Sequence, residues 1–217
     1  MARPPDAAEP PPNCDLCARL AEFRQTNRAA RPDWHNAPVA SFGSPDARLL
    51  IVGLAPGLQG ANRTGRPFTG DYAGDLLYAT LLKFGFAKGN YAARHDDGLE
   101  LQDCMISNAV RCVPPQNKPT VSEIATCRGF LAGRINAMPR LTAILALGRI
   151  AHDSTLAALG SKRSHHSFAH GRRHELAGGP VLFDSYHCSR YNTNTRRLTA
   201  DMFEAVFRDI RHLLPGP

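Results

Sequence analysis

Four of the six cysteines have a spacing that could hold a metal centre. Cys14 and Cys17 form a C-x2-C pair at the predicted start of a helix, whereas Cys112 and Cys127 lie far along the chain. Zinc and an iron-sulfur cluster both accept four thiolates, and the spacing by itself leaves both open. The alternative is that Cys112 and Cys127 are small buried apolar side chains, as we expect of Cys104 in its apolar segment.

Three polar segments each follow a short apolar run. They are APGLQGANRTGRPFTGDY at residues 55–72, SNAVRCVPPQNKP at residues 107–119 and SYHCSRYNTNTRRLT at residues 185–199. The first is not a phosphate-binding P-loop, because Arg66 and Pro67 stand where Lys and Ser or Thr are needed. The spacing of Gly53 and Gly57 does not fit a dinucleotide fingerprint either. Neither nucleotide hydrolysis nor NAD chemistry is indicated.

The apolar runs predict the sheet that must position these segments. Residues 47–54, 104–110, 142–147 and 181–186 are predicted strands, because turn residues bound each run and helical periodicity follows it. Strands that alternate with helices favour a parallel sheet, so the expected fold is an open α/β/α sandwich. In such a sheet ligands bind beyond the C-terminal ends of the strands, where the polar segments begin. The segment at residues 55–72 is predicted to be a binding loop without secondary structure.

Two helix starts can be predicted from capping residues. Thr120 and Glu123 have capping-box spacing and predict a helix that continues to Met138. Asn13 or Asp15 is expected to cap the first helix.

Composition and charge limit the class of protein. Lys and Arg total 26 against 19 Asp and Glu, a net charge of +7, which favours a polyanionic partner such as nucleic acid. No apolar run approaches the ~20 residues of a membrane-spanning helix and the start has no signal-peptide character, so we expect no membrane contact and a cytoplasmic location. Residues 1–12 are proline-rich and predicted to be a disordered tail, with one domain at residues 13–217. The histidines among the basic residues of 162–174 are interpreted as a solvated basic loop.

Together the motifs indicate a family. GLAPGLQGANRTGRPFTGD, SNAVRCVPPQNKP with Cys127 after it, and YHCSRYNTNTRRLT resemble the family 5 (B type) uracil-DNA glycosylases, relatives of the iron-sulfur family 4 enzymes. The resemblance covers nearly the whole domain. It implies a three-layer α/β/α sandwich with a central four-stranded parallel sheet. It also implies hydrolysis of the N-glycosidic bond of uracil in DNA, and we extend this to other deaminated or damaged bases. The product is an abasic site, and the cofactor is a 4Fe-4S cluster whose ligands are Cys14, Cys17, Cys112 and Cys127.

The resemblance also implies roles for three polar residues. His187 is expected to donate a hydrogen bond to the pyrimidine oxygen as negative charge develops there. Asn108 is expected to bind the edge of a uracil that has been flipped out of the duplex. Asp71 matches the acid of the family's loop, and we expect it to position water or stabilise the sugar cation.

Further residues of the motifs are expected to bind substrate. Phe68 would stack on the base, Gly57 would line the site and Asn192 would help to shape it. Arg190 and Tyr191 stand where related enzymes push a wedge into the base stack. We expect the partner to be DNA that contains uracil or other deaminated bases, and the protein to be a monomer.

The chain departs from the pattern of its relatives at three positions. Ala55, which we also place in the substrate site, stands where better-known uracil glycosylases have Asp or Asn, which is why Asp71 is our choice of acid. Cys188 replaces a usual proline, and Arg196 replaces a usual glycine.

Structural roles remain open beside the functional ones. Asp71 could be the N-cap of the helix that begins near Ala73, Asn108 could satisfy backbone groups, Phe68 could anchor the loop and His187 could be a hydrogen-bonded structural residue. The alternative function is a non-catalytic, zinc-stabilised nucleic-acid binding module. Turnover distinguishes it from an enzyme.

Overall fold

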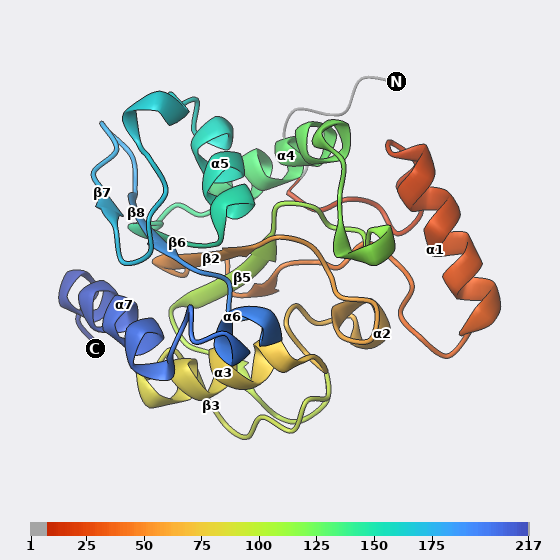
Figure 1. Cartoon of the computed structure of the whole chain (residues 1–217), viewed down its shortest axis with the longest axis horizontal. Helices are drawn as coiled ribbons and strands as arrows, with labels where there is room; N and C mark the ends of the chain where they lie inside the picture. The colour runs from red at the N-terminus through yellow and green to blue at the C-terminus, as the bar shows by residue number, and fades with distance from the viewer. Residues whose placement is uncertain (1–7, 217) are drawn as a thin grey trace.

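A central sheet separates two layers of helices in the computed structural model, which describes residues 8–216 (Figure 1). The sheet has six strands in the order β1-β5-β2-β6-β8-β7. Their bounds are β1 (Phe42–Gly43), β2 (Leu49–Gly53), β5 (Cys104–Asn108), β6 (Ala143–Leu147), β7 (Arg173–His174) and β8 (Val181–Ser185). A separate hairpin pairs β3 (Ala87–Lys88) with β4 (Glu100–Leu101).

The four inner strands are the four predicted ones. β5, β2, β6 and β8 pair in parallel, with Ile51 opposite both Ile106 and Leu145. The expected sandwich and its parallel core are therefore confirmed, but the sheet has six strands and not four. The two additional strands, β1 and β7, lie at the edges of the sheet and pair antiparallel with β5 and β8. Each has two residues, which is too short to give an apolar run or an alternating pattern.

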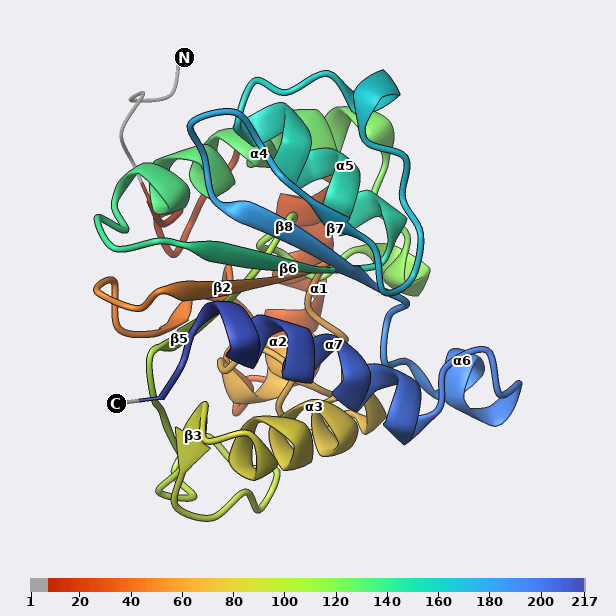
Figure 2. The same cartoon turned by 90° about the vertical axis from the view of Figure 1, so that its left-hand side faces the viewer.

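Helices cover both faces of the sheet. α4 (Val121–Asn136) and α5 (Arg149–Ala158) lie on one face, and α3 (Tyr72–Lys83) and α7 (Ala200–Leu213) lie on the other (Figure 2). Side chains alternate along each strand, so Leu50 packs toward the first layer while Leu49 packs toward the second. Strands with both faces covered are apolar throughout, which explains why they were visible as continuous runs.

Shorter elements complete the chain. They are α1 (Ala18–Ala30), α2 (Ala61–Thr64), α6 (Arg190–Asn194) and the 3-10 turns η1 (Pro115–Asn117) and η2 (Arg163–His165). The α2 turn lies inside the segment predicted to be a loop without secondary structure, so that prediction was wrong over one helical turn. No helix within residues 8–216 is both long and apolar enough to span a membrane.

The two predictions of helix starts had different outcomes. The capping box of Thr120 and Glu123 is confirmed at the start of α4. The cap of α1 was predicted wrongly, because its N-cap residue is Cys17 and no side chain caps it. Asn13 instead accepts a hydrogen bond from Arg28 Nη1 at 2.8 Å.

The beginning of the chain differs from the expected disordered tail. Residues 1–7 lie outside the described residues. In residues 8–12, Glu9 accepts hydrogen bonds from Arg111 Nη1 at 2.9 Å and Arg134 Nη2 at 2.8 Å. Ion pairs between Glu9 and two arginines far along the chain hold this segment to the domain. The composition of the segment by itself does not show such long-range pairs.

The histidine-rich stretch is also not simply a solvated loop. His174 is buried and donates from Nε2 to Asp184 Oδ2 at 2.9 Å, and His152 donates from Nδ1 to Asp184 Oδ1 at 2.7 Å. His152 Nε2 lies 2.8 Å from the carbonyl oxygen of His166. These bonds attach the stretch to β8, and sequence spacing could not show that Asp184 lies beneath it.

Candidate functional site

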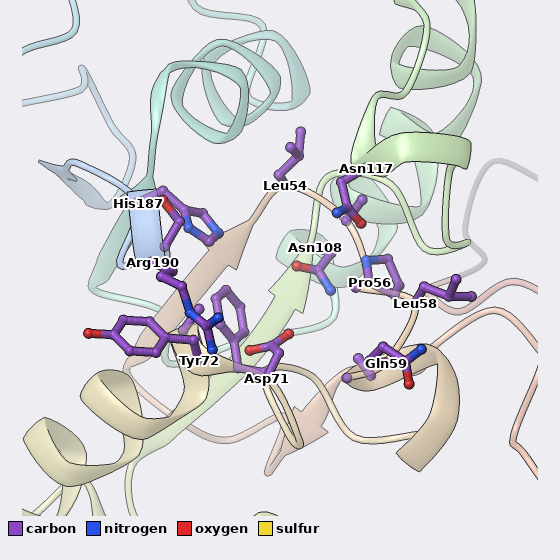
Figure 3. A pocket seen from close by; sticks show the side chains of 17 residues that line it. Leu54, Pro56, Leu58, Gln59, Asp71, Tyr72, Asn108, Asn117, His187 and Arg190 are labelled. Carbon is purple, nitrogen blue, oxygen red and sulfur yellow. The ribbon is translucent and has the colours of Figure 1, made fainter. Parts of the chain in front are cut away.

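A cavity of about 490 Å³ lies beyond the C-terminal ends of β2, β5 and β8 (Figure 3). The three polar segments meet there, as expected from their positions after parallel strands. The predicted site residues that line it are Ala55, Gly57, Phe68, Asp71, Asn108, His187 and Arg190. The volume is that of a small-molecule pocket.

His187 enters the cavity two residues after the end of β8. Desolvation lowers the pKa of its imidazole to about 4, so the ring is neutral at pH 7 and carries one N–H donor. The ring stacks on that of Phe68 with 5.7 Å between centroids. The backbone oxygen of His187 accepts a hydrogen bond from Asn192 Nδ2 at 2.8 Å.

Asn108 is the last residue of β5 and presents an unpaired acceptor. Its Oδ1 is buried and has no hydrogen-bond partner within residues 8–216. A buried acceptor without a donor costs about 1–3 kcal/mol, so a ligand that brings an N–H group would bind favourably. Gly53 leaves the necessary space, because a Cβ there would lie 2.4 Å from Asn108 Oδ1 and 2.6 Å from Phe68 Cζ.

Asp71 uses its two oxygens differently. Oδ1 accepts a hydrogen bond from the Gly74 backbone N–H at 3.2 Å, which confirms Asp71 as the N-cap of α3. Oδ2 faces the first motif, where an added Cβ would approach it to 3.1 Å at Gly57 and 2.4 Å at Gly60. Burial raises the pKa of this carboxyl above its ordinary value. The capping role therefore leaves one oxygen available for a ligand.

Two predicted substrate residues, Asn192 and Tyr191, do not line the cavity. Asn192 contacts it only indirectly, through its hydrogen bond to the backbone oxygen of His187, and Tyr191 is 72% exposed on the surface. Arg190 does line the cavity and places its guanidinium 5.2 Å from the ring centre of Tyr72. Tyr72 is a cavity residue that sequence reasoning missed.

Asn117 was also missed, although its motif was recognised. It lines the cavity on the same side as Asn108 (Figure 3) and follows Gln116 in the chain. The two residues Gln116 and Asn117 have left-handed φ values of 55° and 57°. Two consecutive residues other than glycine in the left-handed region are rare. This backbone conformation brings Asn117 to the cavity, and it cannot be predicted from the residue types.

The four candidate metal ligands come together between α1, the segment after β5, and α4. Cys14, Cys17, Cys112 and Cys127 line one small cavity and pack in one cluster with Leu20. Burial and the neighbouring sulfurs raise the pKa of Cys17 to about 11 and that of Cys112 to about 12. Thiolates at these positions would therefore need a cation among them.

The sulfurs of the four cysteines are not spaced for a single tetrahedral metal ion in the described residues. Tetrahedral zinc with Zn–S bonds of about 2.3 Å holds its sulfurs about 3.8 Å apart. In the described part of the chain, no three of the cysteine sulfurs lie within 4.8 Å of one another. The potential ligand atoms that do are those of His152, His174 and Asp184. A backbone N–H of Arg111 donates to Cys127 Sγ at 3.3 Å and Arg24 Nη1 donates to Cys112 Sγ at 3.7 Å, as suits sulfurs that carry negative charge.

The chain is similar to characterised families over most of its length. Residues 40–211 match the uracil DNA glycosylase superfamily. A Type-5 uracil-DNA glycosylase of Thermus thermophilus is 44% identical over 206 residues, which cover 92% of this chain and 93% of that protein. The Type-5 uracil-DNA glycosylase of Pyrobaculum aerophilum is 38% identical over 90% of this chain and 87% of its own length. A Type-4 uracil-DNA glycosylase of Sulfurisphaera tokodaii is 30% identical over 82% of this chain and 76% of its own.

Proposed function

Because this chain belongs to the uracil DNA glycosylase superfamily, we propose that it hydrolyses the N-glycosidic bond of uracil in DNA and leaves an abasic site. Other deaminated or damaged bases are included in the proposal. The observation that carries it for this chain's own residues is the unpaired Oδ1 of Asn108, buried in a cavity with a neutral histidine. A uracil ring brings an N3–H donor for that oxygen and a carbonyl oxygen for the imidazole N–H.

The cavity residues supply what this bond cleavage needs. As the bond between the base and C1′ breaks, electrons move into the uracil ring and its O2 becomes more negative. The N–H of neutral His187 then donates to O2 more strongly than it did in the ground state. Meanwhile the sugar becomes cation-like, and Asp71 Oδ2 can offset that charge and accept a proton from the attacking water.

Binding of the base is assigned to groups around these residues. Phe68 would stack on the extruded ring, and Ala55 and Gly57 would form the wall beside it. Arg190 would reach into the duplex at the mouth of the cavity, with Tyr191 exposed beside it as the other part of the wedge.

We assign Cys14, Cys17, Cys112 and Cys127 to a 4Fe-4S cluster. Such a cluster would cross-link the N-terminal segment to the segment after β5 and so support the position of Asn108. The assignment is supported by the convergence of the four cysteines around one small cavity, although no three of their sulfurs lie within 4.8 Å of one another in the described residues. The alternative of a zinc-stabilised binding module requires neither this cavity nor the buried, unpaired amide oxygen of Asn108 within it. The predicted monomer and cytoplasmic location remain predictions.

The activity can be tested with a duplex that contains one uracil. Incubation with the protein followed by alkali should break the strand at the uracil, because abasic sites are alkali-labile. His187→Ala should lower the single-turnover rate far more than duplex affinity, because its bond strengthens as the base departs. Binding without strand breaks at any damaged base would support the non-catalytic module.

A further inference from the structure

Arg66, two residues before Phe68, forms a buried ion pair. Its Nη1 and Nη2 donate to the two carboxylate oxygens of Asp97, each at 2.8 Å. The side chains are 5% and 1% exposed. Arg66 is not among the residues that line the cavity.

Aromatic rings surround the Arg66 guanidinium. Its central carbon lies 5.3 Å from the ring centres of both Phe42 and Tyr78, and 5.8 Å from that of Tyr91. Tyr78 and Tyr91 stack on each other at 4.5 Å. A planar cation held by a bidentate carboxylate and three rings has little freedom, so it fixes the two tyrosines.

These groups hold the backbone on both sides of Phe68. Tyr78 Oη donates to the carbonyl oxygen of Pro67 at 2.6 Å, and Tyr91 Oη donates to that of Phe68 at 3.3 Å. Arg66 Nε donates to Thr69 Oγ1 at 2.7 Å. Three successive residues are therefore tied to one buried cation and its rings.

Phe68 needs this support because its backbone is strained. Its φ is 53°, in the left-handed region that a bulky residue rarely adopts. Such conformations cost about 1–3 kcal/mol and persist where surrounding contacts over-determine them. The result is a ring directed to the cavity, 5.7 Å from His187.

We propose that Arg66 is a positioning residue for base excision: it acts through Tyr78, Tyr91 and Thr69 to hold Phe68 in the conformation that places its ring against His187. The inference rests on the proposed function for its effect on rate. Its structural part, the dependence of the Phe68–His187 contact on Arg66, can be tested without activity.

The test is a double-mutant cycle of Arg66→Met and Phe68→Ala. Arg66→Met should slow single-turnover excision about 10- to 100-fold and change duplex affinity less than about 3-fold. In the Phe68→Ala background it should change the rate less than about 3-fold, because residues that act through one another are not additive. Full additivity in an active enzyme would overturn the proposal.

A second measurement applies even if the wild type excises no uracil. The NMR shifts of the His187 imidazole report the neighbouring Phe68 ring, so Arg66→Met should move them as Phe68→Ala does. Unchanged His187 shifts in folded Arg66→Met protein would overturn the proposal. Failure of the wild type to release uracil, with shifted resonances, would count against the proposed function only.

Two further variants separate positioning from general stability. Arg48→Met removes another ion pair, in which Arg48 Nε donates to Asp103 at 2.6 Å, and should leave the rate and the His187 shifts unchanged at a comparable loss of melting temperature. Tyr78→Phe removes the bond to Pro67 and the long bond that Tyr78 Oη accepts from Thr69 Oγ1 at 3.5 Å, and should reproduce part of the Arg66→Met effect. Arg48→Met slowing excision as much as Arg66→Met would show that the effect is general destabilisation.

Discussion

The imidazole of His187 is neutral at ordinary pH because the protein around it excludes water from the charged form. A neutral imidazole still carries hydrogen on one nitrogen and can donate it in a hydrogen bond to the departing base. The role that we assign to His187 therefore does not need the protonated ring. Asp71 has the opposite requirement, because only its ionised form offsets a sugar cation. Burial raises its pKa, and acid therefore removes its charge sooner than it would for an exposed Asp.

The lowered pKa of His187 and the raised pKa of Asp71 predict the pH dependence of excision. The single-turnover rate should fall in acidic solution as Asp71, whose pKa is raised by burial, and His187, whose pKa is about 4, take up protons. In Asp71→Asn, which should be slow throughout, the remaining decline should follow His187 alone, near its pKa of about 4. A decline centred near pH 6.5 in Asp71→Asn would contradict the assigned role of a neutral imidazole, because His187 is then the group that titrates.

Asn108 combines a functional gain with a cost in stability. Its buried, unpaired oxygen makes the ligand-free protein less stable than one without that acceptor. Asn108→Ala should therefore lower excision by about 10- to 100-fold, because the flipped base loses one hydrogen bond worth about 1–3 kcal/mol in the cavity, without lowering the melting temperature.

The neighbouring Ser107 provides the matched control. Ser107→Ala breaks a hydrogen bond from Ser41 Oγ at 3.1 Å, so it should lower the melting temperature and leave the excision rate unchanged. If Asn108→Ala lost stability and kept full activity, the amide would have a structural role only.

In the segment after α6, Arg196 has a left-handed backbone conformation that residues with a Cβ rarely adopt. Arg196 has a φ of 55° and is exposed, at the position where the resembled family usually has glycine. Glycine adopts this conformation without the Cβ penalty, which costs other residues about 1–2 kcal/mol. The departure noted in the sequence thus coincides with a strained position.

Replacing Arg196 with glycine should stabilise the protein. We expect Arg196→Gly to raise the free energy of unfolding by about 1 kcal/mol, measured by urea denaturation. Asn194→Gly is the control, because Asn194 is also exposed and belongs to α6, where its φ is not positive. An equal gain from both variants would show that backbone strain at Arg196 is not the cause.

Considered as a whole, the molecule depends on links between its N-terminal segment and the centre of the sheet. Arg111 lies between Asn108 and Cys112 in sequence, and it is buried with one guanidinium nitrogen bonded to Glu9. The cysteines join the same regions, since Cys14 and Cys17 precede α1 while Cys112 follows β5. A cluster held there would therefore connect distant parts of the chain to the site.

Loss of one ligand should separate these parts. Cys17→Ser should remove the visible absorption of the purified protein and weaken duplex binding. Cys104→Ala is the control, because Cys104 is buried in β5 away from the four-cysteine cluster and should keep the colour. Persistence of the full spectrum in Cys17→Ser would show that the ligand assignment is wrong.

The sequence alone determined the inner sheet, the helix α4 that follows the capping box, and the three segments that meet at one edge. It could do so because strands covered on both faces are apolar throughout and parallel strands place their ends together. It also indicated His187, Asn108 and Asp71 through motifs, although their assigned roles still await the experiments above.

Only the tertiary structure decided which of these groups are buried, unpaired or neutral. The pKa of His187, the unpaired oxygen of Asn108 and the left-handed Phe68 depend on atoms from distant segments. The same holds for the edge strands, whose two residues carry no pattern, and for Glu9, which ion pairs hold against the domain. Desolvation and long-range pairing are properties of the packed chain, so no local pattern of residues could reveal them.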